Sequence, residues 1–315
     1  MRHAIDHLGV KGSTLVIRNG KTWLKFATGN QADTSYLINS VQKSMTAAMI
    51  MREVQKSKLK LSTKLSRFYG AIPGADKVRI SNLLNMTSGL DLKPGEELGE
   101  DIFRSDEDNF QSDIKKTYFN PRMLGKWHYT SVNYVYLCGI LTQLTHKSYE
   151  RLFRDTYIKP LHLKQTEFFW SSKQKLLKSN WVPGYEKVAG QYQHVPHAEA
   201  IKDAHDELGA GSIVMSNSDL AKVMRLILTS KFLTKQSRKE LYQSTAPSYY
   251  NGGFYNLKHY KMANGAGEGY YTFFRSTHEG KTMLIVQANH TAKGKFVKIK
   301  KRINRIMDFM TYFDR

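Results

Sequence analysis

The sequence contains very little cysteine: Cys138 is the only one among 315 residues, which excludes an intramolecular disulfide. Long apolar runs are also missing, and the longest nearly unbroken one, residues 45–51, is far too short to cross a bilayer. Residues 1–7 do not resemble a signal peptide, so we expect either an intracellular protein or a leader or anchor outside this sequence. His194 and His197 lack convincing partners at metal-ligand spacing, and we expect no metal and no cofactor.

Acidic residues are scarce, with 27 Asp and Glu against 48 Lys and Arg, and the formal net charge is +21. Such an excess favours polyanionic partners: nucleic acid, an anionic membrane, or the phosphate-rich polymers of a bacterial wall. The densest basic segment, residues 293–305, alternates with apolar residues at helical spacing: Val297, Ile299, Ile303, Ile306, Met307 and Phe309. We expect a helix packed on the domain with a solvated basic face, and a dedicated polymer-binding helix is the second interpretation. No nucleic-acid motif accompanies the charge, so no nucleic acid is expected.

Strand patterns lie at both ends of the chain. Residues 13–18 and 22–26 flank Asn19-Gly20, a strong hairpin signal, and residues 271–275 and 282–286 form a second pair. Helical patterns occupy the middle, at 41–57, 81–85, 134–145, 148–157 and 218–228. We therefore predict an α/β (α+β) fold in which one antiparallel sheet is assembled from both termini and flanked by helices.

The same distribution predicts two parts. Residues 1–55 and 205–315 would form a discontinuous sheet domain, and residues 56–204 an inserted, mainly helical lobe. A cleft between such parts is a favoured place for a site. The polar segment 91–116 is expected to be a surface loop rather than a lid.

Ser40 and Lys43 stand where an extended run gives way to a long helical pattern. A residue three positions along a helix projects from the same face, so the lysine amine lies beside the serine hydroxyl. The same spacing occurs at three other serines, Ser57, Ser112 and Ser172, but in strongly polar surroundings. Apolar neighbours surround only Ser40 and Lys43, and a lysine withdrawn from water can accept a proton. The alternative is an ordinary serine helix cap followed by a surface lysine.

Two further segments occur at suitable positions: 129–134, Tyr-Thr-Ser-Val-Asn-Tyr, and 263–270, Ala-Asn-Gly-Ala-Gly-Glu-Gly-Tyr. Together with Ser40-Val41-Gln42-Lys43 they resemble the serine β-lactamase and penicillin-binding protein superfamily, most closely its class C and DD-peptidase-like branch. The stretches 78–90 and 209–220 support the resemblance, which runs from about residue 8 to the C-terminus.

The resemblance implies a role for each matching residue. Ser40 would be acylated by the substrate, with Lys43 and Tyr129 as its proton relay. The backbone N–H groups of Ser40 and Ala266 would form the oxyanion hole. The implied substrate-binding residues are Ser131, Asn133, Ala263, Asn264 and Gly265, and the glycine would let the strand edge approach the substrate.

The sequence departs from the family pattern at two positions. Ser131 stands where the branch usually has an asparagine that contacts a substrate amide, and Ala263 stands where it has a lysine or histidine that attracts a carboxylate. Losing such a charged contact costs about 1.5 to 3 kcal/mol. Lys261 or His259 would compensate only if one of them reaches the same pocket. Both departures weaken binding of β-lactams and of peptides that end in D-Ala-D-Ala.

We therefore expect a serine acyl hydrolase that acts outside the cytoplasm at a bacterial surface, on D-alanylated or peptide-bearing cell-wall polymer. Some members with this fold remove D-alanine esters from teichoic acids, and a basic chain suits such an anionic polymer or an anionic membrane surface. A DD-carboxypeptidase, a penicillin-binding protein or a weak β-lactamase is the alternative enzyme. A non-catalytic binder of anionic wall polymer is the alternative of a different class.

Overall fold

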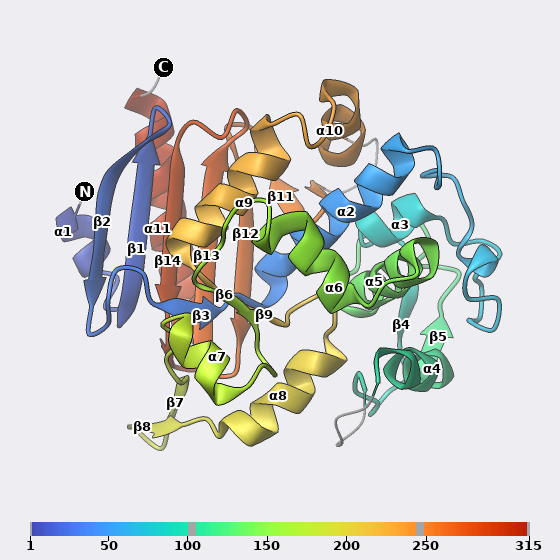
Figure 1. The fold of residues 1–315 in the computed structure, drawn as a ribbon, viewed down its shortest axis with the longest axis horizontal. Helices are drawn as coiled ribbons and strands as arrows, with labels where there is room; N and C mark the ends of the chain where they lie inside the picture. Colours follow the sequence, from blue (N-terminus) through green and yellow to red (C-terminus); the bar gives the residue numbers. More distant parts are fainter. Residues whose placement is uncertain (1, 100–104, 244–248, 314–315) are drawn as a thin grey trace.

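A seven-stranded antiparallel sheet forms one side of the molecule in a computed structural model that describes residues 2–99, 105–243 and 249–313 (Figure 1). Its strand order is β10-β11-β12-β13-β14-β1-β2. The strands are β1 (Gly12–Arg18), β2 (Lys21–Thr28), β10 (Tyr250–Asn251), β11 (Phe254–Asn256), β12 (Tyr260–Gly267), β13 (Tyr270–Thr277) and β14 (Met283–Ala288). β1 pairs with β14, which confirms a sheet built from both termini.

The β1–β2 turn follows the sequence prediction. Asn19 and Gly20 have φ angles of 51° and 76°. Positive φ at both central residues is the geometry of the two-residue hairpin turn that Asn-Gly favours. The predicted second pair is also confirmed, since β13 and β14 are paired antiparallel.

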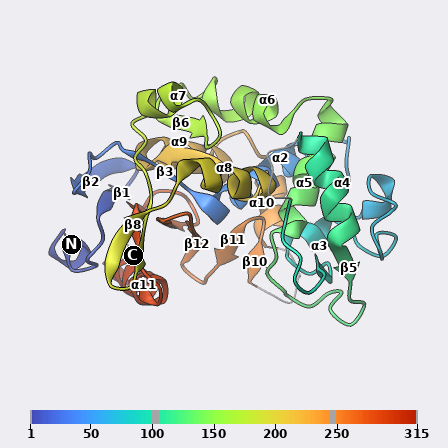
Figure 2. The same cartoon turned by 90° about the horizontal axis from the view of Figure 1, so that it is seen from below.

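Alternating side chains give the sheet two apolar faces. Leu15, Ile17, Met283 and Ile285 belong to the main core with the helices, among them α9 (Asn217–Thr229). Val16, Leu284 and Val286 pack under the terminal helix α11 (Lys295–Phe313), on the opposite face (Figure 2). The predicted amphipathic helix is thus confirmed as a packed one.

Two apolar residues that were expected on the packed face of α11 do not lie there. Val297 and Phe309 have 50% and 59% of their surface exposed, while Ile299, Ile303, Met307 and Met310 make the buried stripe.

Most predicted helices are present. They appear as α2 (Lys43–Gln55), α3 (Ile80–Leu84), α5 (Val132–Thr145), α6 (Tyr149–Phe153) and α9. Cys138 is buried in α5. The other helices are α1 (Arg2–Asp6), α7 (Lys173–Lys178), α8 (His197–Asp206) and α10 (Lys235–Tyr242). No helix among the described residues is long and apolar enough to cross a membrane.

The segment 91–116 is not simply a surface loop, although residues 100–104 lie outside the described residues. It contains α4 (Asp106–Lys116), in which Ser105 caps the first turn by accepting a hydrogen bond from the Asp108 N–H. Three acidic residues in that first turn favour the positive end of the helix dipole, and Phe110 is buried in the main core. Part of the polar composition that suggested a loop, Ser105 and the acidic residues after it, is therefore a helix-start signal.

Short strands connect the middle of the chain to the rest. β6 (Thr166–Phe168) pairs with β9 (Ile213–Ser216), which also pairs with β3 (Ser35–Leu37). β7 (Tyr185–Val188) pairs with β8 (Gln191–His194) and with β15 (His290–Thr291), and β4 (Leu90–Leu92) pairs with β5 (Thr117–Phe119). Strands of the predicted helical lobe, residues 56–204, therefore pair with strands of the predicted sheet domain. The division of the chain into these two parts stays a prediction.

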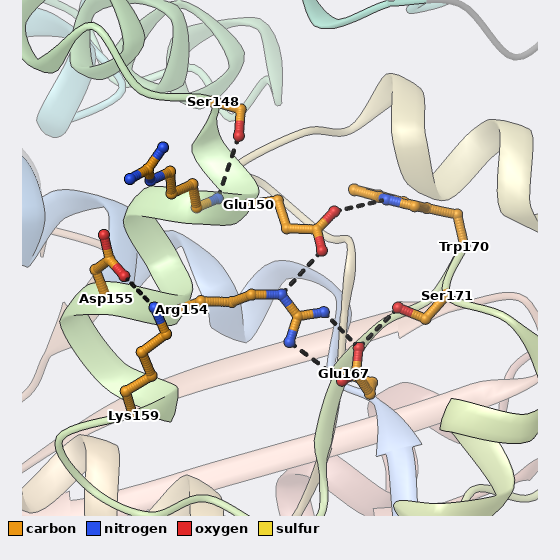
Figure 3. Close-up of polar contacts among 9 residues, drawn as sticks. Ser148, Glu150, Arg154, Asp155, Lys159, Glu167, Trp170 and Ser171 are labelled. Carbon is orange, nitrogen blue, oxygen red and sulfur yellow. Dashed lines mark hydrogen bonds and ion pairs between the residues drawn. The ribbon is translucent and has the colours of Figure 1, made fainter.

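An ionic cluster holds β6 against the helix that follows α5 (Figure 3). Both terminal nitrogens of Arg154 bond the carboxylate of Glu167, at 3.1 and 2.7 Å, and its Nε bonds Glu150 at 2.9 Å. Glu167 also accepts from Ser171, and Glu150 from the Trp170 indole. A guanidinium that bonds a carboxylate with two parallel donors fixes orientation as well as distance.

Candidate active site

Ser40 lies in a single 3-10 turn, Asn39–Gln42, directly before α2. Lys43 is the first residue of that helix, and its Nζ is 2.9 Å from Ser40 Oγ. Asn39, the residue before the serine, has φ +46°, a left-handed conformation that asparagine tolerates better than most residues. The predicted pairing of hydroxyl and amine is present.

The Lys43 side chain is completely buried. Its Nζ has two other oxygen neighbours, Ser131 Oγ at 3.1 Å and the backbone oxygen of Ala210 at 3.2 Å. Among the described residues Lys43 has no carboxylate in ion-pair contact. The amine is therefore held by neutral oxygens alone.

Glu207 fixes the direction of these hydrogen bonds. Ser131 Oγ donates to Glu207 Oε1 at 2.9 Å, so the serine's only proton points away from Lys43. Ser131 and the Ala210 carbonyl can then only accept from the lysine. In the structure Lys43 Nζ also donates to Ser40 Oγ. Once the amine has given up one proton, its two remaining N–H bonds can stay on Ser131 and Ala210 and its lone pair can face Ser40, the orientation that a general base needs.

Tyr129 lies in the loop before α5, and its ring centre is 5.4 Å from Lys43 Nζ. The ring packs edge-to-face on Tyr250 of β10, with centroids 5.8 Å apart. The third predicted catalytic residue therefore stands beside Lys43. Its part in proton transfer stays a prediction.

Strand β12 runs directly against the turn that carries Ser40. A Cβ atom on Gly265 would lie 2.1 Å from the backbone oxygen of Ile38, which no side chain tolerates. Asn39 Nδ2 donates to the backbone oxygen of Gly267 at 3.2 Å. Since Gly265 and Gly267 flank Ala266, these contacts bring the Ala266 backbone close to Ser40. The oxyanion hole formed by the two backbone N–H groups stays a prediction.

Lys261 does not compensate for Ala263. Lys261 lies two residues away on an unbroken stretch of β12, but its ammonium bonds Asn256 Oδ1 and lies 4.6 Å from the Tyr242 ring centre, near α10. His259 directly precedes the strand. Arg275 does donate to the Ala263 oxygen at 3.1 Å. It is fully buried, however, and also bonds Asn304 of α11, so it offers no charge to a ligand.

The remaining predicted substrate-binding residues differ in accessibility. Asn133 is completely buried; its side-chain oxygen accepts from Ser88 at 2.6 Å and its nitrogen donates to the Thr130 oxygen. These bonds support the loop that carries Tyr129 and Ser131, and a substrate contact by Asn133 stays a prediction. Asn264 is partly exposed, and its Oδ1 has no hydrogen-bond partner among the described residues. Asn264 stays a predicted substrate contact.

Carboxylates gather beside this site despite the basic composition. Burial and the neighbouring Asp203, Glu186 and Glu207 raise the pKa of Glu268, at the end of β12, to about 7. Burial is the largest cause of this shift, and the three neighbouring carboxylates add to it. Among the described residues no group of three or more His, Cys, Asp or Glu is arranged to hold a metal ion.

Glu207 and Ala210 are the contacts that the motifs did not reveal. Glu207 is 76 residues from Ser131 and follows a helix whose sequence contains other acidic residues, so nothing local marks it. A weak signal is Gly211, because a Cβ there would lie 2.5 Å from Glu207 Oε2. A glycine four residues after a glutamate is too common to have identified the pair.

Comparison with known proteins agrees with this geometry. Residues 3–303 match the family described as Beta-lactamase. PbpX of Bacillus subtilis (strain 168) is 24% identical over 313 residues, covering 96% of this chain and 77% of PbpX. A Staphylococcus aureus (strain MRSA252) protein named teichoic acid D-alanine hydrolase is 23% identical over 309 residues, covering 91% of this chain and 73% of that protein.

The fold also occurs in a solved enzyme. The crystal structure of D-amino acid amidase from Ochrobactrum anthropi SV3, complexed with L-phenylalanine amide, superposes with a TM-score of 0.83 at 17% identity. The match covers 100% of this chain and 99% of the amidase. The chain belongs to the Beta-lactamase family, as a serine hydrolase related to the penicillin-binding proteins.

Proposed function

We propose that the protein hydrolyses D-alanyl esters on a phosphate-rich cell-wall polymer of the teichoic acid type. Ser40 Oγ attacks the ester carbonyl while its proton passes to Lys43. The alcohol of the polymer leaves with a proton supplied through Lys43 and Tyr129, and D-alanine stays bound to Ser40 as an ester. Water then attacks that ester, D-alanine is released and the Ser40 hydroxyl is regenerated. We further propose that the protein acts at the cell surface.

The charge around Ser40 is the observation that carries this proposal. A D-alanyl ester presents a free ammonium and has no carboxylate, whereas β-lactams and D-Ala-D-Ala peptides present a carboxylate. Position 263 provides no cation, and Lys261 is held near α10. On the other side, Glu207 is linked to Lys43 through Ser131, and Glu268 adds a second carboxylate. Complementary charge favours the ammonium-bearing acyl donor.

The relatives support the same choice. One matching protein is named as a teichoic acid D-alanine hydrolase, and one structural neighbour as a D-amino acid amidase. Both names refer to a D-amino acid.

The direct test is release of D-alanine from D-alanylated lipoteichoic acid. We expect release by the intact protein and none by Ser40→Ala. Absence of release from both would contradict the proposal. Faster release of terminal D-alanine from a D-Ala-D-Ala peptide would assign the protein to the carboxypeptidases instead.

A second test isolates the ammonium. D-alanyl glycerol ester is compared with its N-acetyl derivative, which has the same ester bond and no positive charge. We expect kcat/KM to fall about tenfold or more on acetylation, because a charge-assisted contact is lost. Equal values would show that the carboxylates near Ser40 do not select the acyl group.

A further inference from the structure

A cavity away from Ser40 lies between α9, α10, β12 and the turn that joins β13 to β14. Its volume is about 530 Å³. It is lined by Leu228, Lys235, Gln236, Arg238, Lys239, Tyr242, Gln243, Lys261 and His278. In Figure 1, α10 lies at one end of α9, far from the terminal helix α11 in the fold. This cavity is therefore separate from the basic face of α11.

The cavity is strongly positive. Four of its lining side chains are lysine or arginine, one is histidine, and none of the described lining residues is acidic. Two carboxylates lie outside the lining: Glu240 accepts a hydrogen bond from Gln236 at 2.6 Å, and Glu279 favours the charged form of Lys261 through space, an effect smaller than that of burial. The lysines and the arginine of the lining form no ion pair within the described part of the chain.

Lys261 makes this more than a surface patch. Its side chain is 4% exposed, and its ammonium contacts a neutral amide oxygen and a tyrosine ring. A buried charge without an opposite charge is unfavourable, and burial accordingly lowers the pKa of Lys261 to about 8. A bound anion would supply the missing counter-charge.

The side chain of Arg238 is also held at this cavity by hydrogen bonds. Its Nη1 donates to the backbone oxygen of Ser230 at 2.6 Å and to that of Leu233. These bonds fix the guanidinium at the cavity without consuming its charge. An arginine and lysines around one concave site match the geometry and charge of a phosphate group.

We propose that this cavity binds a phosphodiester group of the polymer whose D-alanyl ester reaches Ser40. The inference rests on the proposed function and adds a second point of attachment for the same substrate. Lys261 and Gly265 are on one strand, four residues or about 13 Å apart. A chain of repeating phosphodiesters is long enough to contact both places at once.

The test measures binding separately from hydrolysis. Soluble poly(glycerol phosphate) without D-alanine is titrated against the intact protein, Lys261→Met and Arg238→Gln. We expect the Kd to rise about tenfold or more for each variant. Lys298→Met removes one charge from the exposed face of α11 and serves as the matched control, with an expected change of less than about twofold. The double variant Lys235→Gln/Lys239→Gln alters only exposed side chains and tests the cavity without any risk to folding.

Three outcomes decide the question. Equal weakening by Lys298→Met and Lys261→Met would overturn the proposal, because net charge alone would then explain binding. If Lys261→Met weakened binding to phosphatidylglycerol vesicles but not to the polymer, the cavity would serve a membrane and the proposal would fail. Competition by inorganic phosphate that disappears in Lys261→Met would support it.

Hydrolysis of D-alanyl glycerol ester distinguishes a failure of the phosphodiester site from a failure of the proposed ester hydrolysis. The ester has no phosphate, so we expect Lys261→Met to hydrolyse it at the rate of the intact protein. If the intact protein fails to hydrolyse this ester or lipoteichoic acid but still binds the polymer through Lys261, the proposed hydrolysis is wrong and the phosphodiester site stands.

Discussion

Lys43 and Lys261 are the two lysine side chains that are buried within the described residues, and their surroundings differ. Lys43 has three oxygen neighbours, one of them the predicted nucleophile. Lys261 has one amide oxygen and a tyrosine ring, and it opens onto a cavity of other cations. The first lysine has its hydrogen-bonding capacity filled, while the second lacks an opposite charge. The difference agrees with the two proposed roles: Lys43 transfers protons, and Lys261 binds an anion.

Lys43→Met gives the largest expected effect. Methionine has a similar volume without the amine, so we expect acylation of Ser40 to slow by about a hundredfold to ten-thousandfold, the range for a lost general base. The rate of labelling by a fluorophosphonate measures this. Because the lysine is enclosed, the variant should unfold at the same or a higher urea concentration. An active Lys43→Met would show that Lys43 is not the base, and Ser40→Ala provides the unlabelled reference.

Lys261→Met is expected to change stability in a way that depends on pH. Burial places the pKa of Lys261 near 8 in the folded protein, below its usual 10.5. Below pH 8 the amine is charged in both states, and the folded state carries the full cost of the buried charge. Between pH 8 and 10.5 only the unfolded state binds the proton, so the stability of the intact protein rises with pH.

The variant should therefore be more stable than the intact protein at pH 7, by up to about 3 kcal/mol, and the gap should close toward pH 10. Urea unfolding at several pH values gives the free energies. Lys298→Met, on the exposed face of α11, should show no such gap. A gap that stays constant with pH would mean that Lys261 does not titrate as the comparison requires.

Removing the Glu207 carboxylate should affect Lys43 and leave Lys261 unchanged. In Glu207→Ala the Ser131 proton is free to turn toward Lys43 and compete with Ser40 for its lone pair, so we expect kcat to fall about tenfold to a hundredfold. Glu207→Gln keeps an oxygen that accepts from Ser131 and should retain more activity. The pH dependence of kcat in the three proteins is the measurement. Full activity of Glu207→Ala would remove Glu207 from the site.

Arg154→Lys tests a cation that does have carboxylate partners, and its effect should be the smallest. Losing the two parallel bonds to Glu167 should lower the free energy of unfolding by about 1 kcal/mol at pH 7. Burial opposes ionisation of Glu167, but hydrogen bonds from Arg154 and Ser171 outweigh it and lower its pKa below 4.5. This stabilisation is present above pH 4.5 and is lost as the pH falls through the folded-state value. Arg151→Lys, exposed on the same helix, is the control in urea unfolding.

Local patterns were sufficient to predict much of the fold. The Asn19-Gly20 turn and the helix at Lys43 follow from neighbouring residues, so the sequence contains the information in one place. The polar composition of 91–116 indicated a loop, whereas Ser105 and the acidic residues that follow it are a local signal for the start of α4. The exposed Val297 and Phe309 show that helical spacing alone does not identify the buried stripe of α11.

The site was predictable only where the chemistry lies in a short motif. Ser40 and Lys43 are three residues apart, and a helix fixes their distance. Glu207 meets Ser131 only in the folded chain, and no motif around Glu207 in the sequence marks it as a site residue. Lys261 is close enough in sequence to Ala263 to supply the missing cation. The pairing of β12 with β11 and the position of α10 instead hold its ammonium against Asn256. Such long-range placement depends on packing that no spacing rule contains.

The close approach of β12 to Ile38 has a consequence for biosynthesis. Gly265 is made more than two hundred residues after Ser40. At a synthesis rate of about 5 to 20 residues per second, the serine exists for roughly ten to fifty seconds before its partner strand has been translated. During that interval the nascent chain lacks half of the predicted oxyanion hole. The enzyme is thus expected to become chemically competent only after β12 has been translated and has packed against the turn that carries Ser40.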